Sequence, residues 1–278
     1  MKIVKATGEI EKFSKGKFCT SLEKAGAPDD VVQNVCERVS GELKPGMTTS
    51  DIFRKASKYL VQKNTAAAAR YNTKRGIANL GPAGFVFEQF VEIVLHELGY
   101  KTARNRFVKG ACVSHEVDVL AWKDDEHVIV EAKYHNSPNI KTHIDHIMYA
   151  DARLMDIERA HQKEGERGVR HTIWVFTNTR FTSKAIRYAK CRHMRLTGWN
   201  YPAKESLENL VNRYALYPVT VLPSVDRVSL EQLSRANMML ARDIAPYTPE
   251  KFAREFHIER TRAERIVSEA HALMYGNN

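Results

Sequence analysis

The sequence predicts a multidomain protein of mixed α+β and α/β class, in which a central mixed sheet flanked by helices lies between an N-terminal hairpin with four helices and a C-terminal helical module. Residues 1–80 contain two short strand-like segments and four amphipathic helical segments. Alternation of apolar and polar residues within 115–133 is typical of two strands, and helical periodicity returns after residue 200. A chain of 278 residues is long enough for two or three domains. We therefore expect domains at 1–80, 81–200 and 201–278.

The first domain is expected to begin with strands at residues 3–5 and 10–13, joined by a turn at Thr7-Gly8. Four helices should follow, beginning at Ser14, Pro28, Thr49 and Ala66. Ser14 and Thr49 are residue types that cap helix N-termini, and Gly26 is a typical helix stop. A small hairpin on four helices can form an independent core.

The central domain should begin with a helix over 84–98, stopped by Gly99. Two strands follow, around the turn Lys123-Asp-Asp-Glu126. The remaining segments predict a helix over 144–160, a buried strand over 171–177, a helix capped by Ser183 and a short strand over 195–200. The resulting order, α-β-β-α-β-α-β, is typical of a mixed sheet between helices.

Three chemically significant residues should meet on the hairpin. If the turn centres on Asp124 and Asp125, the antiparallel register places Asp118 opposite Glu131, and the period of two puts Lys133 on the face of Glu131. The opposite face is then apolar and consists of Val117, Val119, Val128 and Val130.

Two adjacent carboxylates suit a hard divalent cation such as magnesium, and a nearby lysine can stabilise charge on a phosphate. Glu88 lies at the margin of the preceding helix face, between Phe87 and Val91, where it would supply a third acid. The alternative is a salt bridge on a solvated strand, with Glu88 as an ordinary surface residue.

The order of a Gly-x-x-x-Glu helix, a hairpin Asp and Glu-x-Lys resembles the PD-(D/E)xK nucleases, specifically the Mrr-like restriction endonucleases, over residues 81–200. The resemblance implies a metal-dependent endonuclease in which Glu88, Asp118 and Glu131 hold Mg²⁺ or Mn²⁺. Lys133 would be the catalytic lysine and would help to orient the attacking water. Many Mrr-like enzymes have Gln where this chain has Glu131, and no residue matches the glutamine that they often carry on the next helix.

Residues 1–80 resemble the ATP-cone, a nucleotide-sensing domain. The matching motifs are Val4-Lys5-Ala6-Thr7-Gly8, Glu11, Phe13-Ser14, Lys17 and Thr49-Ser50-Asp51-Ile52. By resemblance, Val4 belongs to the binding hairpin, Lys5 and Lys17 hold the triphosphate of ATP or dATP, and Gly8 lets the backbone approach. Glu11 and Thr49 would contact the nucleoside.

The chain departs from the ATP-cone pattern at two positions of the hairpin motif. Ala6 stands where a basic residue is usual, and Thr7 stands where Asp or Asn is common. The alternative is a degenerate cone that acts only in packing or dimerisation. The sequence contains no Gly-x-x-x-x-Gly-Lys-Ser/Thr motif, so hydrolysis of the P-loop type is excluded and the nucleotide would be an effector.

The charge balance favours a polyanionic partner, which we expect to be DNA. The chain has 43 Lys and Arg against 33 Asp and Glu, for a net charge of +10. Basic residues cluster over 101–109 and 184–195, either as solvated faces or as contacts to a phosphate backbone. Residues 248–270 are reminiscent of half of a helix-hairpin-helix, with His257-Ile258 at the usual glycine. His143-x-x-His146 would need a third ligand to bind a metal.

Cysteine spacing and hydropathy indicate a cytoplasmic protein. The four cysteines are far apart and form no Cys-x-x-Cys, so we expect reduced thiols and no structural zinc. We expect neither a signal peptide nor a membrane span, since no apolar run is long enough.

These observations lead to one functional hypothesis, a nucleotide-regulated, magnesium-dependent nuclease that hydrolyses phosphodiester bonds in DNA and acts as a homo-oligomer, a dimer in the simplest case. The alternatives are a non-catalytic, nucleotide-sensing DNA-binding regulator, or the same chemistry on RNA or branched DNA.

Overall fold

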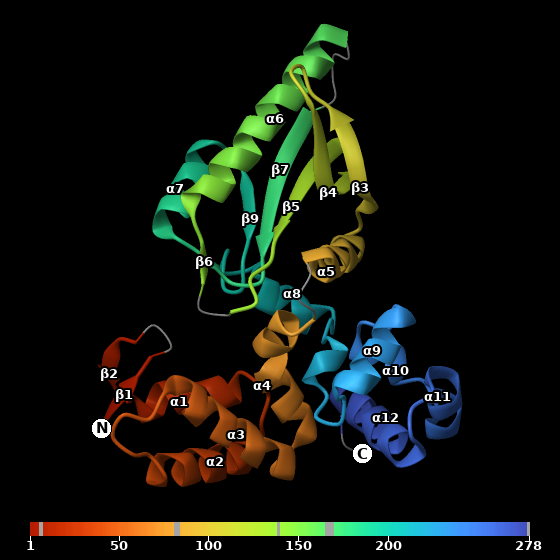
Figure 1. Cartoon of the computed structure of the whole chain (residues 1–278). Helices are drawn as coiled ribbons and strands as arrows, with labels where there is room; N and C mark the ends of the chain where they lie inside the picture. Colours follow the sequence, from red (N-terminus) through yellow and green to blue (C-terminus); the bar gives the residue numbers. More distant parts are fainter. Residues whose placement is uncertain (6–7, 81–83, 138–139, 165–169, 277–278) are drawn as a thin grey trace. The chain divides into compact units, whose positions relative to one another are not determined.

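The computed structural model describes all residues except 6–7, 81–83, 138–139, 165–169 and 277–278. The chain divides into two compact units, Met1–Gly76 with Tyr217–Asn278, and Ile77–Leu216. The expected fold class is confirmed, since a hairpin with helices, a five-stranded mixed sheet and C-terminal helices are all present (Figure 1). Each unit is described by itself.

The N-terminal part of the first unit is a hairpin followed by four helices. Strands β1 (Lys2–Val4) and β2 (Ile10–Lys12) pair antiparallel. Ala6 and Thr7 of the expected turn lie outside the described residues, and Gly8 has a φ of +83°. The helices are α1 (Lys15–Glu23), α2 (Asp29–Gly41), α3 (Thr49–Lys63) and α4 (Thr65–Ala78).

Side-chain caps and an apolar core define these helices. Ser14 Oγ accepts from the Lys17 amide at 3.3 Å, which confirms the expected cap of α1. The cap of α3 is Thr48 and not the expected Thr49, and Thr48 forms a reciprocal capping box with Asp51. The core consists of residues repeated at helical spacing and fully buried, such as Leu22, Val35, Val39, Ala56 and Leu60.

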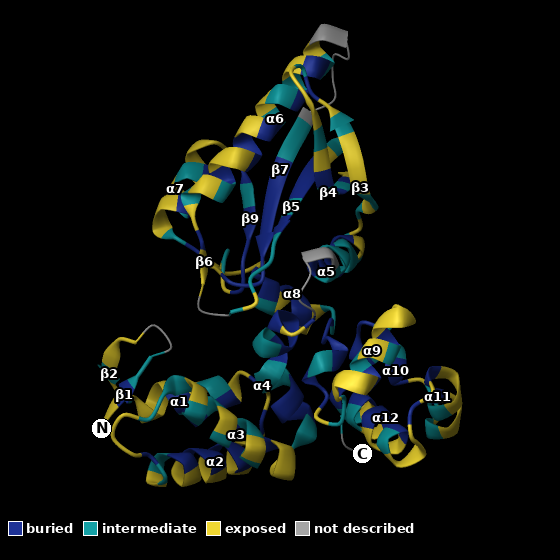
Figure 2. Cartoon of the chain, viewed as in Figure 1, coloured by how far each residue is buried: buried dark blue, intermediate teal, exposed yellow. Residues whose placement is uncertain are grey.

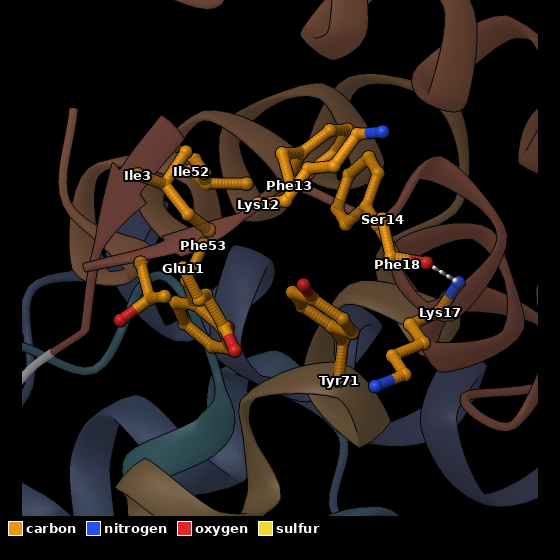
Figure 3. Close-up of a pocket in the computed structure, with 11 residues that line it drawn as sticks. Ile3, Glu11, Lys12, Phe13, Ser14, Lys17, Phe18, Ile52, Phe53 and Tyr71 are labelled. Carbon is orange, nitrogen blue, oxygen red and sulfur yellow. Dashed lines mark hydrogen bonds between the residues drawn. The ribbon is translucent and has the colours of Figure 1, made fainter. Parts of the chain in front are cut away.

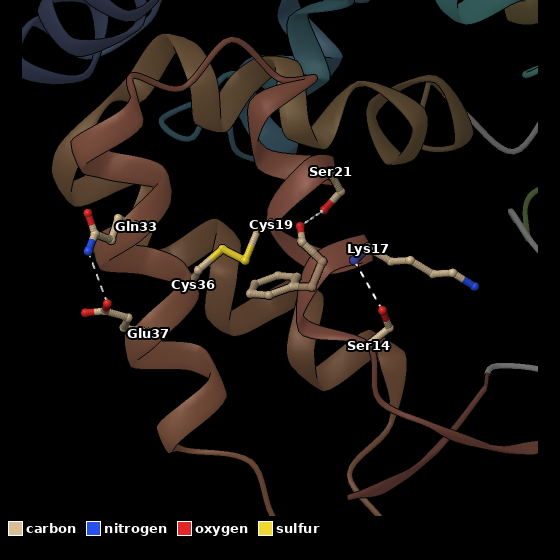
Figure 4. Close-up of a disulfide and its surroundings, with 8 residues drawn as sticks. Ser14, Lys17, Cys19, Ser21, Gln33, Cys36 and Glu37 are labelled. Atoms are coloured by element: carbon tan, nitrogen blue, oxygen red, sulfur yellow. Dashed lines mark hydrogen bonds between the residues drawn. A yellow bond between two sulfur atoms is a disulfide. The ribbon is translucent and has the colours of Figure 1, made fainter.

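A disulfide joins α1 to α2, which corrects the expectation that all four cysteines are reduced. Cys19 and Cys36 lie on facing sides of the two helices, with their Cα atoms 5.6 Å apart (Figure 4). The sequence separation of 17 residues concealed this proximity, because it depends on how α1 packs against α2. Cys112 and Cys191 are free and exposed.

The C-terminal part of the first unit is helical: η1 (Val219–Val221), α9 (Arg227–Arg235), α10 (Ala241–Ile244), α11 (Pro249–Phe256) and α12 (Arg260–Tyr275). The helical pattern of residues 230–241 does not form one continuous helix. Helix α9 ends at Arg235, and Asn237 then takes a left-handed conformation with φ of +55°.

This C-terminal part packs on α4 through a glycine. Thr220 Oγ1 donates to the Gly76 carbonyl at 2.7 Å, and a Cβ atom on Gly76 would lie 2.5 Å from Val221 Cγ1. Six residues earlier on α4, Arg70 donates to the carbonyl of Leu273 on α12 at 3.3 Å. The absence of a side chain at Gly76 therefore permits the close approach.

The second unit contains a sheet in the order β3-β4-β5-β7-β9. Its strands are β3 (Lys101–Lys109), β4 (Ser114–Lys123), β5 (Glu126–Lys133), β7 (Arg170–Thr177) and β9 (Arg195–Thr197). The first three pair antiparallel and the last three pair parallel. Strands β5 and β7 run through the buried centre of the sheet (Figure 2).

Strand β3 was missing from the order expected from sequence. It is an edge strand of mostly polar residues, none of them buried, so it carries little of the apolar alternation that identifies a strand. Its backbone pairing with β4 defines it instead. The short strands β6 (Lys141–Thr142) and β8 (Arg180–Phe181), which pair with each other, were not predicted either.

Helices cover both sides of this sheet. Helix α5 (Gly84–Glu97) lies on one side, and α6 (Ile144–Glu164) and α7 (Ser183–Cys191) lie on the other (Figure 1). The cap of α7 is Thr182 and not Ser183, because Thr182 Oγ1 accepts from the Ala185 amide at 3.2 Å. Helix α8 (Leu207–Arg213), capped by Ser206, follows β9. No described helix combines the length and apolar composition of a membrane span.

Candidate active site and nucleotide cavity

The β4–β5 hairpin has the register expected from its turn. Asp124 and Asp125 form the turn, and the paired residues extend from Lys123 and Glu126 to Val119 and Val130. Asp118 and Glu131 are the next residues along this register, directly beyond the last pair. The Ala132 amide donates to Asp118 Oδ2 at 2.7 Å. The side chain of Asp118 thus accepts a backbone hydrogen bond at the point where the two strands part.

Asp118 is a perturbed carboxylic acid. Burial and then the charge of Glu131 raise its pKa from 3.8 to about 6, against the hydrogen bond from Ala132 and the charge of Arg153. A partly buried carboxylic acid whose pKa is raised by a neighbouring carboxylate is typical of a site that binds a cation or transfers a proton.

Glu88 extends this acidic group from α5. Burial, and next the charge of Asp118, raise the pKa of Glu88 above its ordinary value. The charge of Arg104 acts in the opposite direction. The structure therefore brings the helix acid near Asp118, although the two residues are 30 positions apart and on different elements.

Glu131 is held by an arginine that sequence reasoning missed. Arg153 on α6 donates from Nη1 to Glu131 Oε2 at 2.6 Å, and only 9% of Arg153 is exposed. The ring of Tyr149, one turn earlier, lies 4.9 Å from the guanidinium. One signal was available: Arg153 falls among Ala150, Ile157 and Ala160 on the buried stripe of the helix, where an unpaired cation would be costly.

Lys133 is the last residue of β5, two residues after Glu131. Its positive charge acts on two histidines, His135 and His146. Burial, followed by the charge of Lys133, lowers the pKa of both His135 and His146. His135 Nε2 lies 3.0 Å from Thr142 Oγ1, and its backbone is fixed by two hydrogen bonds with the Asn178 side chain. The end of the sheet at Lys133 is therefore polar and structurally well defined.

The carboxylates of Asp118 and Glu131 are the type of ligand that a hard divalent cation prefers. Mg²⁺ and Mn²⁺ prefer oxygen ligands, and a cation beside Asp118 and Glu131 would relieve the repulsion that raises the pKa of Asp118. Within the described residues, however, no three His, Cys, Asp or Glu side chains are already arranged around a common point, His143 and His146 included. One oxygen of Glu131 is bonded to Arg153 instead.

The two basic clusters separate into structural and exposed residues. Arg104 pairs with Glu92, Arg192 with Asp151 and Arg195 with Glu126, at 2.6–2.8 Å. A basic strip remains exposed on β6, β8 and α7, and within the described part of the chain its members form no ion pair: Lys141, Arg180, Lys184, Arg187 and Lys190. Because Thr177 is the register partner of Lys133, β8 begins just beyond the Lys133 end of the sheet.

In the first unit, a cavity of about 260 Å³ opens between the hairpin and helices α1, α3 and α4 (Figure 3). Three residues expected to bind nucleotide line it, Glu11, Lys17 and Thr49. Lys5 contacts the cavity indirectly, through an ion pair with Glu11 at 2.9 Å. Val4 and Gly8 are outside the described lining, and the Val4 amide donates to the Met47 carbonyl instead.

Aromatic side chains, which sequence reasoning missed, form much of the cavity. Phe53 on α3 and Tyr71 on α4 stack with their ring centroids 4.6 Å apart, and both line it. The Arg75 guanidinium lies 3.6 Å over Phe53. Phe13 and Phe18 line the same space. Only the proximity of α3 and α4 reveals this arrangement, which suits a flat heterocycle.

The α11–α12 turn has the shape of a helix hairpin without its glycine. His257 adopts the left-handed conformation, with φ of +54°, that glycine would take there. The carboxylate of Glu259 accepts from the amides of Thr261 and Arg262 at the start of α12. An acidic side chain thus already satisfies the amides that a phosphate would use in such a motif.

Comparison with known proteins supports this division of chemistry. Family models match residues 1–75 as an ATP cone domain, 82–200 as a restriction endonuclease and 217–274 as "AF1548-like, C-terminal". An uncharacterized protein of Archaeoglobus fulgidus is 38% identical over 177 residues, which cover 64% of this chain and 95% of that protein. The crystal structure of AF1548, a protein of unknown function, is 36% identical, with a TM-score of 0.55 over 70% of this chain and 99% of its own.

Both resemblances inferred from sequence are confirmed by these matches. The relative from Archaeoglobus fulgidus is matched over nearly its whole length, at an identity that establishes common descent. The chain therefore belongs to the AF1548-like family and carries an ATP cone domain and a restriction endonuclease domain.

Proposed function

We propose that the protein is a metal-dependent endonuclease that cleaves DNA under the control of an adenine nucleotide. In this proposal residues 1–80 sense the nucleotide, residues 81–200 cleave, and residues 201–278 form an accessory module. One observation carries the proposal: the charge of Glu131 acts on Asp118 and the charge of Asp118 acts on Glu88, on the strand that ends at Lys133 and the helix beside it, in a domain that matches restriction endonucleases.

Asp118 and Glu131 would hold Mg²⁺ or Mn²⁺, with Glu88 as the third acid. When bound, such a cation neutralises charge on the phosphate and activates water. Asp118 is suited to this role because its Oδ2 is oriented by the Ala132 amide. Glu131 projects from a strand on which both neighbouring residues are buried, which restrains its backbone.

Lys133 would orient the attacking water and stabilise charge on the phosphorus-bound oxygens. Its position supports this role, because it follows Glu131 by two residues on the same strand and so extends from the same face. Burial and the charge of Lys133 lower the pKa of the nearby His135 and His146, which disfavours the cationic forms that would compete for the phosphate.

The DNA backbone would run along the basic strip. Lys141 and Arg180 lie on the short strands just beyond the Lys133 end of the sheet, the other three cations lie on the helix that follows, and all five are exposed without acidic partners among the described residues. Contacts of this kind position a duplex and are independent of base sequence. The same strip could receive RNA or branched DNA, so the choice of substrate belongs to experiment.

The cavity of the cone would bind ATP or dATP as an effector. Phe53 and Tyr71 offer faces for the adenine, Glu11 and Thr49 offer polar contacts, and Lys17 offers charge for the phosphates. Lys5 would join the triphosphate after leaving Glu11. Val4 and Gly8 would contribute through the backbone of the hairpin.

A cleavage assay tests the proposal. Supercoiled, linear, nicked, branched and single-stranded DNA, with an RNA control, would be incubated with Mg²⁺ in the presence and absence of ATP. We expect metal-dependent cleavage of at least one DNA substrate that is lost in Lys133→Ala and altered by ATP. Nucleic-acid binding without cleavage under every condition would instead support the non-catalytic regulator.

A further inference from the structure

A positively charged side chain, the Arg153 guanidinium, lies within the acidic site. The Arg153 guanidinium bonds Glu131 at 2.6 Å and also acts electrostatically on Asp118, so one positive charge serves both proposed metal ligands. The pair is enclosed, with 10% of the Arg153 side chain and 19% of the Glu131 side chain exposed. Breaking an ion pair so shielded from water costs far more than breaking one on the surface, because it leaves a buried charge without a partner.

Arg153 is firmly held on one side and incompletely satisfied on the other. It stands on the buried stripe of α6, with the Tyr149 ring over its guanidinium. Its Nε atom is buried and has no hydrogen-bond partner within the described part of the chain. A donor left without an acceptor in a buried place costs free energy, which a newly arriving acceptor would recover.

We propose that Arg153 competes with the divalent cation for Glu131 and yields Glu131 when a nucleic-acid phosphate offers the guanidinium another acceptor. This inference rests on the proposed nuclease function. Arg153 is then a positioning residue: without substrate it keeps Glu131 in place and keeps the metal out. With substrate, the phosphate and the metal enter together.

The chemistry of the partners favours this exchange. A guanidinium forms bidentate hydrogen bonds to phosphate as readily as to carboxylate, so Arg153 can pass from one to the other without losing charge-assisted bonds. The metal and the phosphate each favour the state in which Glu131 has left Arg153. Two ligands that select the same state bind cooperatively.

Tyr149 provides the route toward substrate. Tyr149 is 62% exposed, yet its ring lies against the buried guanidinium, so Arg153 is one side chain away from solvent. An exposed aromatic residue beside the acids can also pack against the sugar or base of a bound strand.

The test measures Mn²⁺ binding to the full chain by calorimetry, independently of cleavage. Without DNA, Arg153→Met should bind Mn²⁺ about 10-fold more tightly than the wild type, because the competing cation is gone. Arg153→Lys, which keeps the charge, should remain near the wild type and guards against a folding defect in the Met variant. Arg192→Met is the matched control, since Arg192 also pairs with a buried acid of α6, Asp151, at 2.8 Å.

A second arm measures the coupling. In a Lys133→Ala background, which keeps the DNA intact, a short duplex should raise the affinity for Mn²⁺ when Arg153 is present and leave it unchanged in Arg153→Met. Equal affinities for Mn²⁺ in wild type and Arg153→Met, or equal coupling in both, would overturn the inference alone. Absence of Mn²⁺ binding in every variant, together with absence of cleavage, would overturn the proposed metal site and this inference with it.

Discussion

The nucleotide cavity and the acidic site both contain an ion pair among the residues proposed to bind ligand, but the two pairs differ in exposure. In the cone, Lys5 and Glu11 have side chains that are 35% and 41% exposed. In the nuclease domain, the corresponding values for Arg153 and Glu131 are 10% and 19%. An exposed pair contributes at most about 1 kcal/mol and opens easily. When a buried pair opens, each of its two charges needs a new partner of opposite charge.

The two sites therefore differ in how completely their proposed ligand-binding residues are already arranged. The cone offers a cavity that is already formed and lined by stacked rings. The nuclease domain offers three acids whose metal arrangement is incomplete within the described residues. The same composition of carboxylates and basic side chains thus serves an open binding site in one place and a restrained one in the other.

The largest expected effect is the loss of DNA cleavage when Lys133 or Asp118 of the acidic site is substituted. Lys133→Ala or Asp118→Ala should lower the rate of DNA cleavage by about 10² to 10⁴-fold, the usual contribution of a positioned catalytic group. DNA binding, measured by fluorescence anisotropy, should stay within about twofold because neither residue belongs to the basic strip. Wild-type cleavage rates in both variants would disprove the assignment of the site.

The next effect concerns pH and the stability of the metal-free protein. Since folding raises the pKa of Asp118 from 3.8 to about 6, its ionised form is disfavoured in the folded state. The resulting penalty is absent below about pH 4, grows between pH 4 and 6, and is complete above that range. Asp118→Asn, which keeps an acceptor for the Ala132 amide, should therefore stabilise the protein by about 1–3 kcal/mol at pH 8.

Chemical denaturation of both proteins at pH 4 and pH 8, with a chelator present, measures this difference. The gain from Asp118→Asn should be absent at pH 4, and saturating Mg²⁺ at pH 8 should abolish it by stabilising only the wild type. A gain that is equal at both pH values would show that packing, and not charge, limits the stability at Asp118.

A smaller effect is expected in the cone. Lys17→Ala should weaken binding of ATP or dATP about 10-fold, the loss of one charge-assisted contact to phosphate. Lys24→Ala is the control, because Lys24 is an exposed lysine at the end of the same helix. Calorimetry on the full chain measures both. If neither nucleotide binds the wild type at near-millimolar concentration, the cone is degenerate.

The smallest expected effect is on association. Cleavage of both strands calls for two acidic sites related by a twofold axis, so we expect a dimer whose population changes several-fold with nucleotide. Light scattering with and without ATP, alongside cleavage at the same protein concentrations, tests this. A monomer that cuts both strands at one rate in either condition would contradict it.

The sequence by itself determined the local geometry of both sites. The turn at Asp124 and Asp125 set a register that placed Asp118 and Glu131 at matching positions, because a two-residue turn leaves one antiparallel pairing. The capping of α1 by Ser14 and the valine stripe of α2 were equally local, since hydrogen bonds and burial within one helix decide them.

Only the tertiary structure decided which distant side chains share a charge or a surface. Arg153 meets Glu131 because α6 packs across β5, and Cys19 meets Cys36 because α1 packs against α2. Phe53 and Tyr71 stack because α3 and α4 are neighbours, and edge strand β3 exists through its pairing with β4. Periodicity in a sequence reports which side of an element is buried. The partner that buries it is selected by packing between elements, and a single sequence carries no direct record of that choice.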